Sequence, residues 1–364
     1  MLGLICHHGD WDDFIRDARV VQRVSIEKRV PVTYLFSGME LDKLADNRDK
    51  VHNALWFDLV GAIQSSNYFI NPRCGDSNPH KSEIGVAPYN HIPLVQPWAQ
   101  NLWGEYFWGI LKDQMLWSKG IAERKFYKTP VTVHPPDGVY APAAADLLRK
   151  LGFDTVVVSG EFLGGNGHAK GILYWASGLR HLMRTNDIQP QSGEFQNARN
   201  LVDRVEQYGH ENDMPFVVIS CDIDEFNGMR GMNLDDGVAR LCCIGDEVYR
   251  RNGRVQMVNA NAAAYWNLHQ APMEWFWPWN DVHAQIHGDG GLGWINEERN
   301  GVITHLIWLV GERYRQGWDG GVIQRAKECL WRAGDIACRN GYFGEGLRNY
   351  FWGNVNHARY LLQG

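Results

Sequence analysis

Short, continuous runs of apolar residues recur along the chain, and segments with helical periodicity separate them. An uninterrupted run of Val, Ile and Leu predicts a strand that is buried on both faces, and strands joined through helices are typically parallel. Strands are expected at residues 2–6, 30–36, 131–134, 155–159, 216–221 and 255–259, and helices at residues 12–28, 40–63, 141–151 and 235–251. This order predicts an α/β fold built around a parallel sheet.

Two further features favour one parallel architecture over another. The first expected strand is followed by His7-His8-Gly9-Asp10-Trp11 rather than by the glycine-rich fingerprint of a dinucleotide-binding sheet, which favours a β/α barrel. The count of expected strands is nearer seven than eight. Beyond about residue 300 the pattern changes to helices at residues 302–314, 321–340 and 347–362. We therefore expect a β/α-barrel catalytic domain at residues 1–300 and a helical region at residues 301–364 packed on it.

Composition narrows the classes of partner. The net charge of −6 gives no reason to expect a nucleic-acid partner. No apolar run approaches the ~20 residues needed to span a bilayer, so we expect no membrane association. The seven cysteines include no Cys-x-x-Cys pair, and the first residues lack the basic region of a signal peptide. These observations favour a reducing, cytoplasmic location, and an oligomer is compatible with them.

Polar residues gather where four of the expected strands end. Function in a parallel barrel lies at the carboxyl ends of the strands, and carboxylates that directly follow buried strands are costly unless they are solvated or paired. Capping of the following helix is the competing explanation, but Asp137 precedes Gly138, and Asp222 is followed by the Asn227-Gly228 turn rather than by a helix. We therefore predict a functional role for these residues. They are His7, His8, Asp10 and Trp11 after the first strand, His134, Asp137 and Tyr140 after the strand at 131–134, Glu161 after residues 155–159, and Asp222 and Asp224 after residues 216–221.

The carboxyl groups of Asp137 and Asp222, at the ends of different strands, could meet across a barrel mouth. Cleavage of a glycosidic bond needs such a pair, one protonated and one ionised. Hydrolysis of this kind requires no cofactor. A divalent metal is the alternative, because the His-x-Asp spacing of His8 and Asp10, together with His91, could bind one cation.

Tryptophan is abundant, with sixteen in the chain. Trp275 and Trp277 fall in a proline-containing segment that cannot form a regular helix. Alternating indole rings in such a loop can stack on the apolar face of a sugar, although tryptophan also fills large cores. We therefore include both residues among the candidates for substrate binding.

Taken in order, four segments resemble family-57 glycoside hydrolases of the glycoside hydrolase/deacetylase barrel superfamily, and the resemblance implies that the chain is a divergent member. They are residues 6–10, 82–94, 134–142 and 222–226. The resemblance implies an incomplete, seven-stranded β/α barrel with a carboxy-terminal helical domain, acting on carbohydrate of the α-glucan class as a retaining hydrolase or transglycosylase. It implies Asp137 as nucleophile, Asp222 as acid/base, with Asp224 in the same acidic motif. The remaining residues expected to contact the substrate are His7, His8, Asp10, Trp11, His91, His134, Tyr140, Glu161, Trp275 and Trp277.

The chain also departs from the family pattern. The family nucleophile is a glutamate, whereas Asp137 is one methylene shorter, so the substrate or the reaction can differ from that of the family. Two alternatives stay open. The sequence Pro135-Pro136-Asp137-Gly138 is similar to a strand end of metal-dependent polysaccharide deacetylases, although their Thr-Phe-Asp-Asp-Gly and His-x-x-x-His signatures are missing. The other alternative is a non-catalytic sugar-binding protein.

Overall fold

The computed structural model describes most of the sheet, several of the helices around it and the carboxy-terminal helices. Its described residues are 2–7, 31–46, 83–90, 106–126, 129–135, 140, 143–159, 174–176, 178–185, 188, 197–211, 217–222, 243–266, 297–338 and 345–363. The strands are β1 (Leu2–His7), β2 (Thr33–Ser37), β3 (Glu83–Ala87), β4 (Thr132–Val133), β5 (Thr155–Ser159), β6 (Tyr174–Ala176), β7 (Leu179–Arg184) and β8 (Val217–Asp222). The helices are α2 (Gly38–Asp46), α5 (Phe107–Phe126), α6 (Ala143–Lys150), α7 (Ala198–Glu211), α10 (Ala260–Trp266), α12 (Glu297–Arg315), α13 (Gly320–Cys338) and α14 (Glu345–Gln363).

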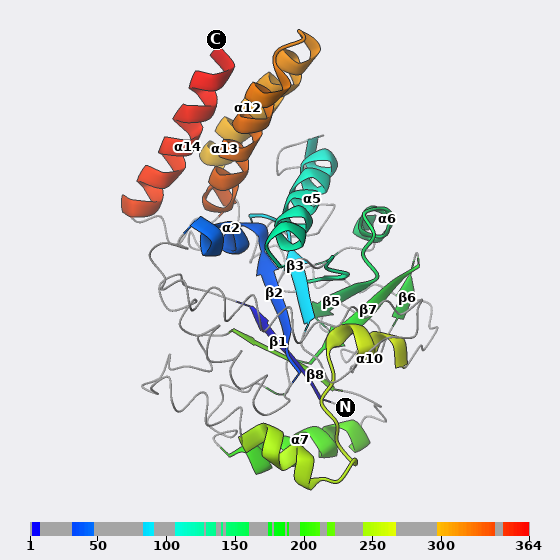
Figure 1. Cartoon of the computed structure of the whole chain (residues 1–364). Helices are drawn as coiled ribbons and strands as arrows, with labels where there is room; N and C mark the ends of the chain where they lie inside the picture. The colour runs from blue at the N-terminus through cyan, green and yellow to red at the C-terminus, as the bar shows by residue number, and fades with distance from the viewer. Residues whose placement is uncertain are drawn as a thin grey trace.

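All described strands belong to one sheet, in the order β5-β4-β3-β2-β1-β8-β7-β6 (Figure 1). Neighbouring strands are parallel, apart from β6, which runs antiparallel to β7. A further parallel pairing joins β5 to β7, so the sheet curls until distant strands of the order meet. The predicted α/β class and the parallel, curled sheet are therefore confirmed. The number of strands in the whole barrel stays a prediction, because parts of the chain between the strands lie outside the described residues.

Side chains on the two faces of the sheet belong to different layers. Val156 and Val158 pack in the large core beneath the surrounding helices, whereas Val157 between them packs with Leu182 and with alanines of α10. This alternation follows from the two-residue period of a strand. Helix α10 therefore lies on the inner face of the curled sheet, and the larger core lies on its outer face.

The amino end of α10 is held by the first residues of the strands. The backbone N–H of Ala260 donates to Thr33 Oγ1 over 2.8 Å, and that of Asn261 donates to Glu83 Oε1 over 3.1 Å. Asn259 caps the same helix, because its Oδ1 accepts from the N–H of Ala262 over 2.8 Å. The strand predicted at residues 255–259 is therefore wrong. Those residues are largely buried, which explains their apolar pattern, but beyond one isolated bridge they lead into a capped helix.

Other expected boundaries are close to those of the structure. The helix expected from residue 40 begins at Gly38, because Ser37 and Glu40 form a reciprocal capping box. The helix expected at 141–151 is α6, and it ends before Gly152, whose φ is +82°. The helix expected at 12–28 lies outside the described residues.

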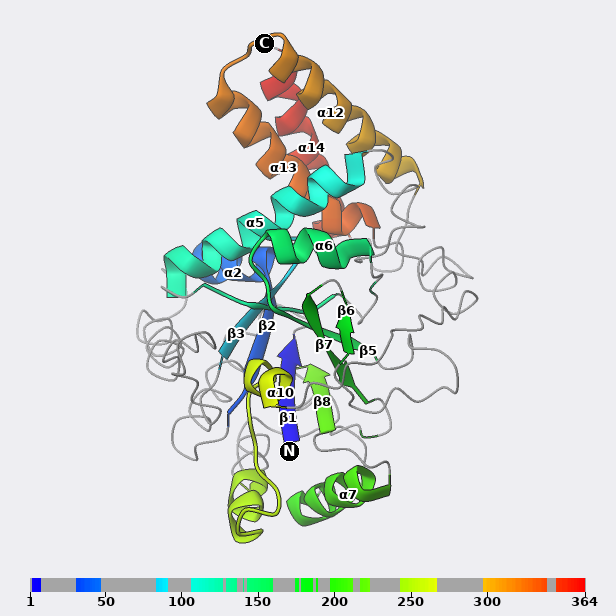
Figure 2. The ribbon, with the colours of Figure 1, turned by 90° about the vertical axis from the view of Figure 1, so that its right-hand side faces the viewer.

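The three carboxy-terminal helices gather at one end of the molecule, beside α5, and α7 lies at the opposite end (Figures 1 and 2). Helices α12, α13 and α14 pack against one another, as the helical pattern beyond residue 300 predicted. Whether they form a domain of their own stays a prediction. None of the helices in the described part of the chain is long and apolar enough to cross a membrane.

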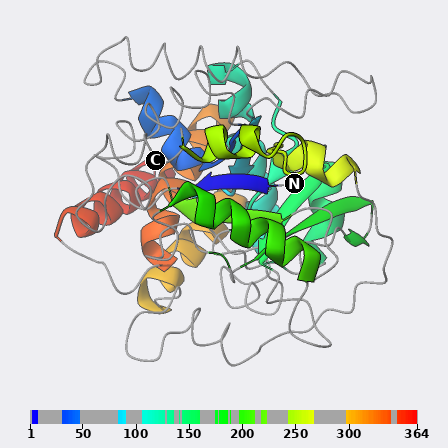
Figure 3. The same ribbon diagram turned by 90° about the horizontal axis from the view of Figure 1, so that it is seen from below.

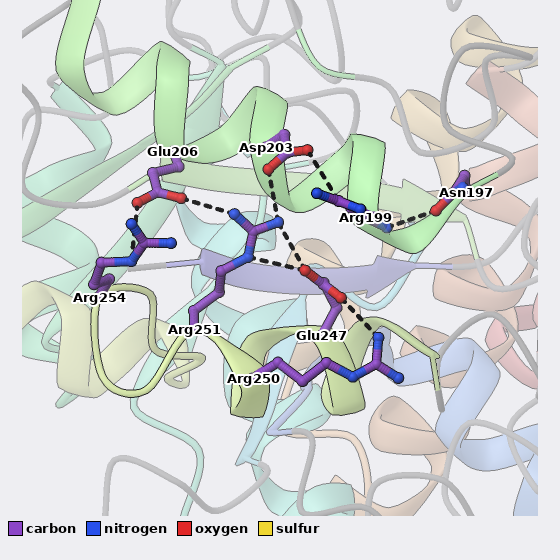
Figure 4. Close-up of polar contacts among 8 residues, drawn as sticks. All are labelled: Asn197, Arg199, Asp203, Glu206, Glu247, Arg250, Arg251 and Arg254. Atoms are coloured by element: carbon purple, nitrogen blue, oxygen red, sulfur yellow. Dashed lines mark hydrogen bonds and ion pairs between the residues drawn. The ribbon is translucent and has the colours of Figure 1, made fainter.

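A network of ion pairs fixes α7 to the helical residues 243–250 (Figures 3 and 4). The Arg251 guanidinium lies at its centre, 2.6 Å from Asp203, 3.1 Å from Glu206 and 2.8 Å from Glu247. Arg251 and Glu247 are both largely buried. Because a buried charge is tolerated only with close partners, this network specifies how the two helical segments pack.

Candidate functional site

The carboxyl ends of β1 and β8 lie side by side. The two strands pair in parallel over their whole length, and the last register pair joins His7 to Asp222 (Figure 2). Neighbouring strands lie about 4.8 Å apart, so these two backbone positions are adjacent although they come from distant parts of the sequence. Two of the predicted site residues therefore share one point on the carboxyl edge of the sheet.

His134 follows β4 on the same edge and is almost fully buried. Its ring Nδ1 lies 3.3 Å from the carbonyl oxygen of Val157 on β5. A carbonyl only accepts, so Nδ1 carries the proton in this contact and Nε2 is the basic nitrogen. The backbone N–H of His134 donates to the Val86 carbonyl of β3 over 3.0 Å. Three strands therefore fix the position and the tautomer of this imidazole.

Tyr140 occupies a different environment. It is fully buried in the outer core, and its hydroxyl lies 3.0 Å from Nε2 of His181 on β7. Burial raises the pKa of the Tyr140 hydroxyl well above its ordinary value. His181 is itself completely buried as the partner of Tyr140. The contacts of Tyr140 are those of a core residue, and its role in substrate binding stays a prediction.

The turn that follows β3 leads to His91. Its residues Tyr89 and Asn90 are buried and are held by side chains and backbone groups of α2, α5 and α13. Sequence reasoning did not single out these two residues. The signal available was their position immediately before a histidine in a segment with a family resemblance.

The other predicted site residues lie outside the described part of the chain, as do the side chains of His7 and Asp222. They are His8, Asp10, Trp11, His91, Asp137, Glu161, Asp224, Trp275 and Trp277. Their roles stay predictions, and so does the separation of the Asp137 and Asp222 carboxyl groups. The same holds for the alternative metal ligands His8, Asp10 and His91. Within the residues that the structure describes, no group of three or more His, Cys, Asp or Glu side chains could hold a metal ion.

Glu83 is a functional group that sequence reasoning missed, and it lies at the opposite end of the strands. Its carboxyl is fully buried and accepts from the hydroxyls of Thr33 (3.1 Å) and Thr132 (3.3 Å), as well as from the Asn261 amide. Burial raises the pKa of this carboxyl from its ordinary value of 4.5 to about 7, against the opposing effect of those hydrogen bonds. Its position at the amino ends of the strands indicates a role in holding α10 rather than in chemistry.

No protein-family model and no curated protein sequence matches the chain. Solved structures do match its fold. The 4-α-glucanotransferase of Thermococcus litoralis aligns over 99% of this chain and 59% of its own, with a TM-score of 0.63 at 14% identity. The α-amylase AmyC of Thermotoga maritima aligns over 100% of this chain and 92% of its own, with a TM-score of 0.61 at 10% identity. The exo-type maltose-forming amylase of Pyrococcus sp. ST04 aligns over 97% of this chain and 64% of its own, with a TM-score of 0.57 at 13% identity.

These matches establish a likeness of fold. The chain spans about three fifths of the length of the glucanotransferase and nearly the full length of AmyC. At 10–14% identity these matches show the fold alone. The chain shares its barrel fold with these carbohydrate-acting enzymes, as the resemblance of its four segments implied, and it is a divergent example of that fold.

Proposed function

We propose that this protein is a carbohydrate-active enzyme that cleaves or transfers glycosidic bonds at the carboxyl edge of its barrel. The observation that carries the proposal is the register of β1 with β8, which sets His7 beside Asp222. Carboxylates and imidazoles at strand ends are the groups that acid/base chemistry needs, and the carboxyl edge is where barrels of this kind carry them. The shared fold with a glucanotransferase and two amylases supports an α-glucan as the class of substrate.

The proposed mechanism is a double displacement. A carboxylate oxygen of Asp137 bonds to the anomeric carbon while the bond to the leaving oxygen breaks, and Asp222 gives that oxygen its proton. Water or a sugar hydroxyl then attacks the anomeric carbon, Asp222 takes its proton, and Asp137 is released. This chemistry requires the two carboxyl groups to lie ~5–5.5 Å apart.

In this proposal the neighbouring residues bind and orient the sugar. Among these, His134 is the residue whose place the structure describes most fully, because its ring is held beside the Val157 carbonyl at the carboxyl edge. Trp275 and Trp277 would stack on sugar rings. No metal or other cofactor takes part, and we propose that the enzyme works in the cytoplasm.

The first experiment follows products released from maltoheptaose and amylose by the purified full chain. Asp137→Asn and Asp222→Asn should each abolish turnover without changing the melting temperature by more than a few degrees. Glu211→Gln, an acidic-to-amide change at an exposed residue of α7, is the matched control and should keep full activity. Near-full activity in either aspartate variant would show that the assignment is wrong.

A second experiment separates the alternatives. Turnover of the glucan should continue after treatment with a chelator, and the anomeric configuration of the product should be retained. Release of acetate from an N-acetylated oligosaccharide, lost with the chelator and restored by a divalent cation, would favour the deacetylase alternative. Binding of a glucan with no product of any kind would favour the non-catalytic sugar-binding protein.

A further inference from the structure

The turn Tyr89–Asn90 at the end of β3 is buried, although turns at a sheet edge usually face solvent. A buried turn has to satisfy its polar groups inside the protein. The partners of these two residues come from three helices that belong to distant parts of the chain. We call the turn, together with these partners, the edge junction.

Helices α2 and α5 enclose Tyr89. The backbone N–H of Met39 donates to the Tyr89 carbonyl over 3.0 Å, and the Tyr89 hydroxyl donates to Asp42 Oδ2 over 2.9 Å. Burial, and then the negative charge of Asp42, raise the pKa of this hydroxyl far above its ordinary value, so it stays a donor. The Tyr89 ring stacks on Trp117 of α5, with centroids 3.8 Å apart and planes 6° from parallel. The backbone carbonyl, the hydroxyl and the ring of Tyr89 are therefore all held in place.

Asn90 joins the turn to the carboxy-terminal helices. Its backbone N–H donates to Gln114 Oε1 of α5 over 3.3 Å, and its side-chain Nδ2 donates to the Trp331 carbonyl of α13 over 3.2 Å. The Arg332 guanidinium, one position further along α13, lies 4.0 Å from the carboxylate of Asp42. A helix some 240 positions away in sequence thus contacts the end of β3 through a buried hydrogen bond and a neighbouring ion pair.

The end of β3 is in turn bonded to the candidate site. The Val86 carbonyl of β3 accepts from the backbone N–H of His134, whose ring is aligned by β5. A displacement of β3 would therefore carry His134 with it. The path from α13 to the imidazole therefore runs through the Asn90 side chain, the backbone from residue 90 back to Val86, and the Val86–His134 hydrogen bond.

We propose that Asn90 is a positioning residue through which α13 sets the geometry of the carboxyl edge around His134. The inference rests on the proposed function for its catalytic consequence, but its structural part stands on the contacts above. Its energetic basis is the cost of leaving a buried amide or carbonyl without its partner, which favours one placement of α13 on the edge. The carboxy-terminal helices are then a part of the working site and not an independent appendage.

The first test needs no substrate. In the full chain labelled with ¹⁵N-histidine, the His134 signals are identified by their loss in His134→Gln. Asn90→Ala should shift the His134 ring signals, because the ring is no longer held in one place. Gln324→Ala removes an exposed side chain from α13, and it should leave the signals unchanged.

The second test uses turnover of maltoheptaose. Asn90→Ala should lower kcat by tenfold or more and leave KM within about threefold, since misplacement by ~1 Å of a group that orients the substrate costs about 100-fold in rate. Asn90→Asp keeps the shape but loses the amide donor, and a protonated carboxyl can replace that donor. Its kcat relative to the unsubstituted protein should therefore recover as the pH is lowered from 8 to 5.

Each outcome decides the proposal. Unchanged His134 signals in a folded Asn90→Ala protein would overturn it, and so would altered signals with an unaltered kcat. If Asn90→Ala does not fold, Asn90→Asp answers the same two questions. If the unsubstituted chain releases no product from any glucan, the proposed function fails, and the histidine signals alone then decide whether α13 positions His134 through Asn90.

Discussion

The buried Glu83 carboxyl should make the folded state less stable as the pH rises through neutrality. It lies between the amino ends of β2, β3 and β4 and the first turn of α10, where its Oε1 accepts from Thr33, Thr132 and the Asn261 amide. Burial disfavours the charged form and raises the pKa of this carboxyl to about 7. Between about pH 4.5 and 7 the folded state therefore holds a proton that the unfolded chain, with its ordinary pKa of 4.5, has already released.

The size and sign of the effect follow from linkage. Where the folded state binds more protons than the unfolded state, stability falls as the pH rises. For Glu83 the loss begins near pH 4.5 and is complete somewhat above pH 7. A difference of 2.5 between 7 and 4.5, at 1.36 kcal/mol per pKa unit, gives a total loss of about 3 kcal/mol, of which about 2.5 kcal/mol falls between pH 5 and pH 9.

The assay is urea unfolding of the full chain and of Glu83→Gln at several pH values from 5 to 9. The amide keeps an oxygen for the Asn261 N–H but does not titrate, so the variant should lack this component of the pH dependence. Between pH 5 and 9 the free energy of unfolding of the unsubstituted chain should fall by about 2–3 kcal/mol more than that of Glu83→Gln. Parallel curves, or a steeper fall in the variant, would refute the argument that burial controls this carboxyl.

Three further predictions concern stability and are read from thermal or urea unfolding. Gly38→Ala should destabilise the protein by ~1–3 kcal/mol, because a Cβ there would lie 2.5 Å from a serine hydroxyl of α5. A Cβ at Gly353 would meet nothing within 4 Å, so Gly353→Ala should stabilise α14 by ~0.5–1 kcal/mol. Arg251→Ala should cost ~1–3 kcal/mol, because it removes a cation shared by Glu247, Glu206 and Asp203 while each of them keeps a second arginine partner, and Arg250→Ala, at an exposed guanidinium, should cost less than ~1 kcal/mol. Tyr140→Phe should lose ~1–2 kcal/mol with its buried hydrogen bond and leave KM for a glucan unchanged, and a large rise in KM would instead support a direct role in substrate binding.

The strands that sequence reasoning found are those whose apolar runs are unbroken. β5 was expected at its observed bounds because three consecutive valines predict a strand that is buried on both faces. β3 was missed because Glu83 and Gly85 interrupt its apolar residues. Both residues have a structural reason on the inner face of the sheet. Glu83 accepts a hydrogen bond from the first turn of α10, and a Cβ on Gly85 would meet Leu35 and the Thr132 carbonyl.

The same distinction applies to the candidate site. Local patterns could indicate that polar residues follow buried strands, because that depends on a few consecutive residues. They could not show that His7 and Asp222 are adjacent, since the pairing of β1 with β8 depends on how the whole sheet curls. Nor could they show that α13 contacts the turn after β3, because the Asn90 side chain donates a hydrogen bond to a backbone carbonyl. Every residue has such a carbonyl, so the sequence does not indicate which one is the partner. A site on this fold is therefore assembled by sheet closure and helix docking, and substitutions at the contacts that dock the helices, at Asn90 above all, should alter it.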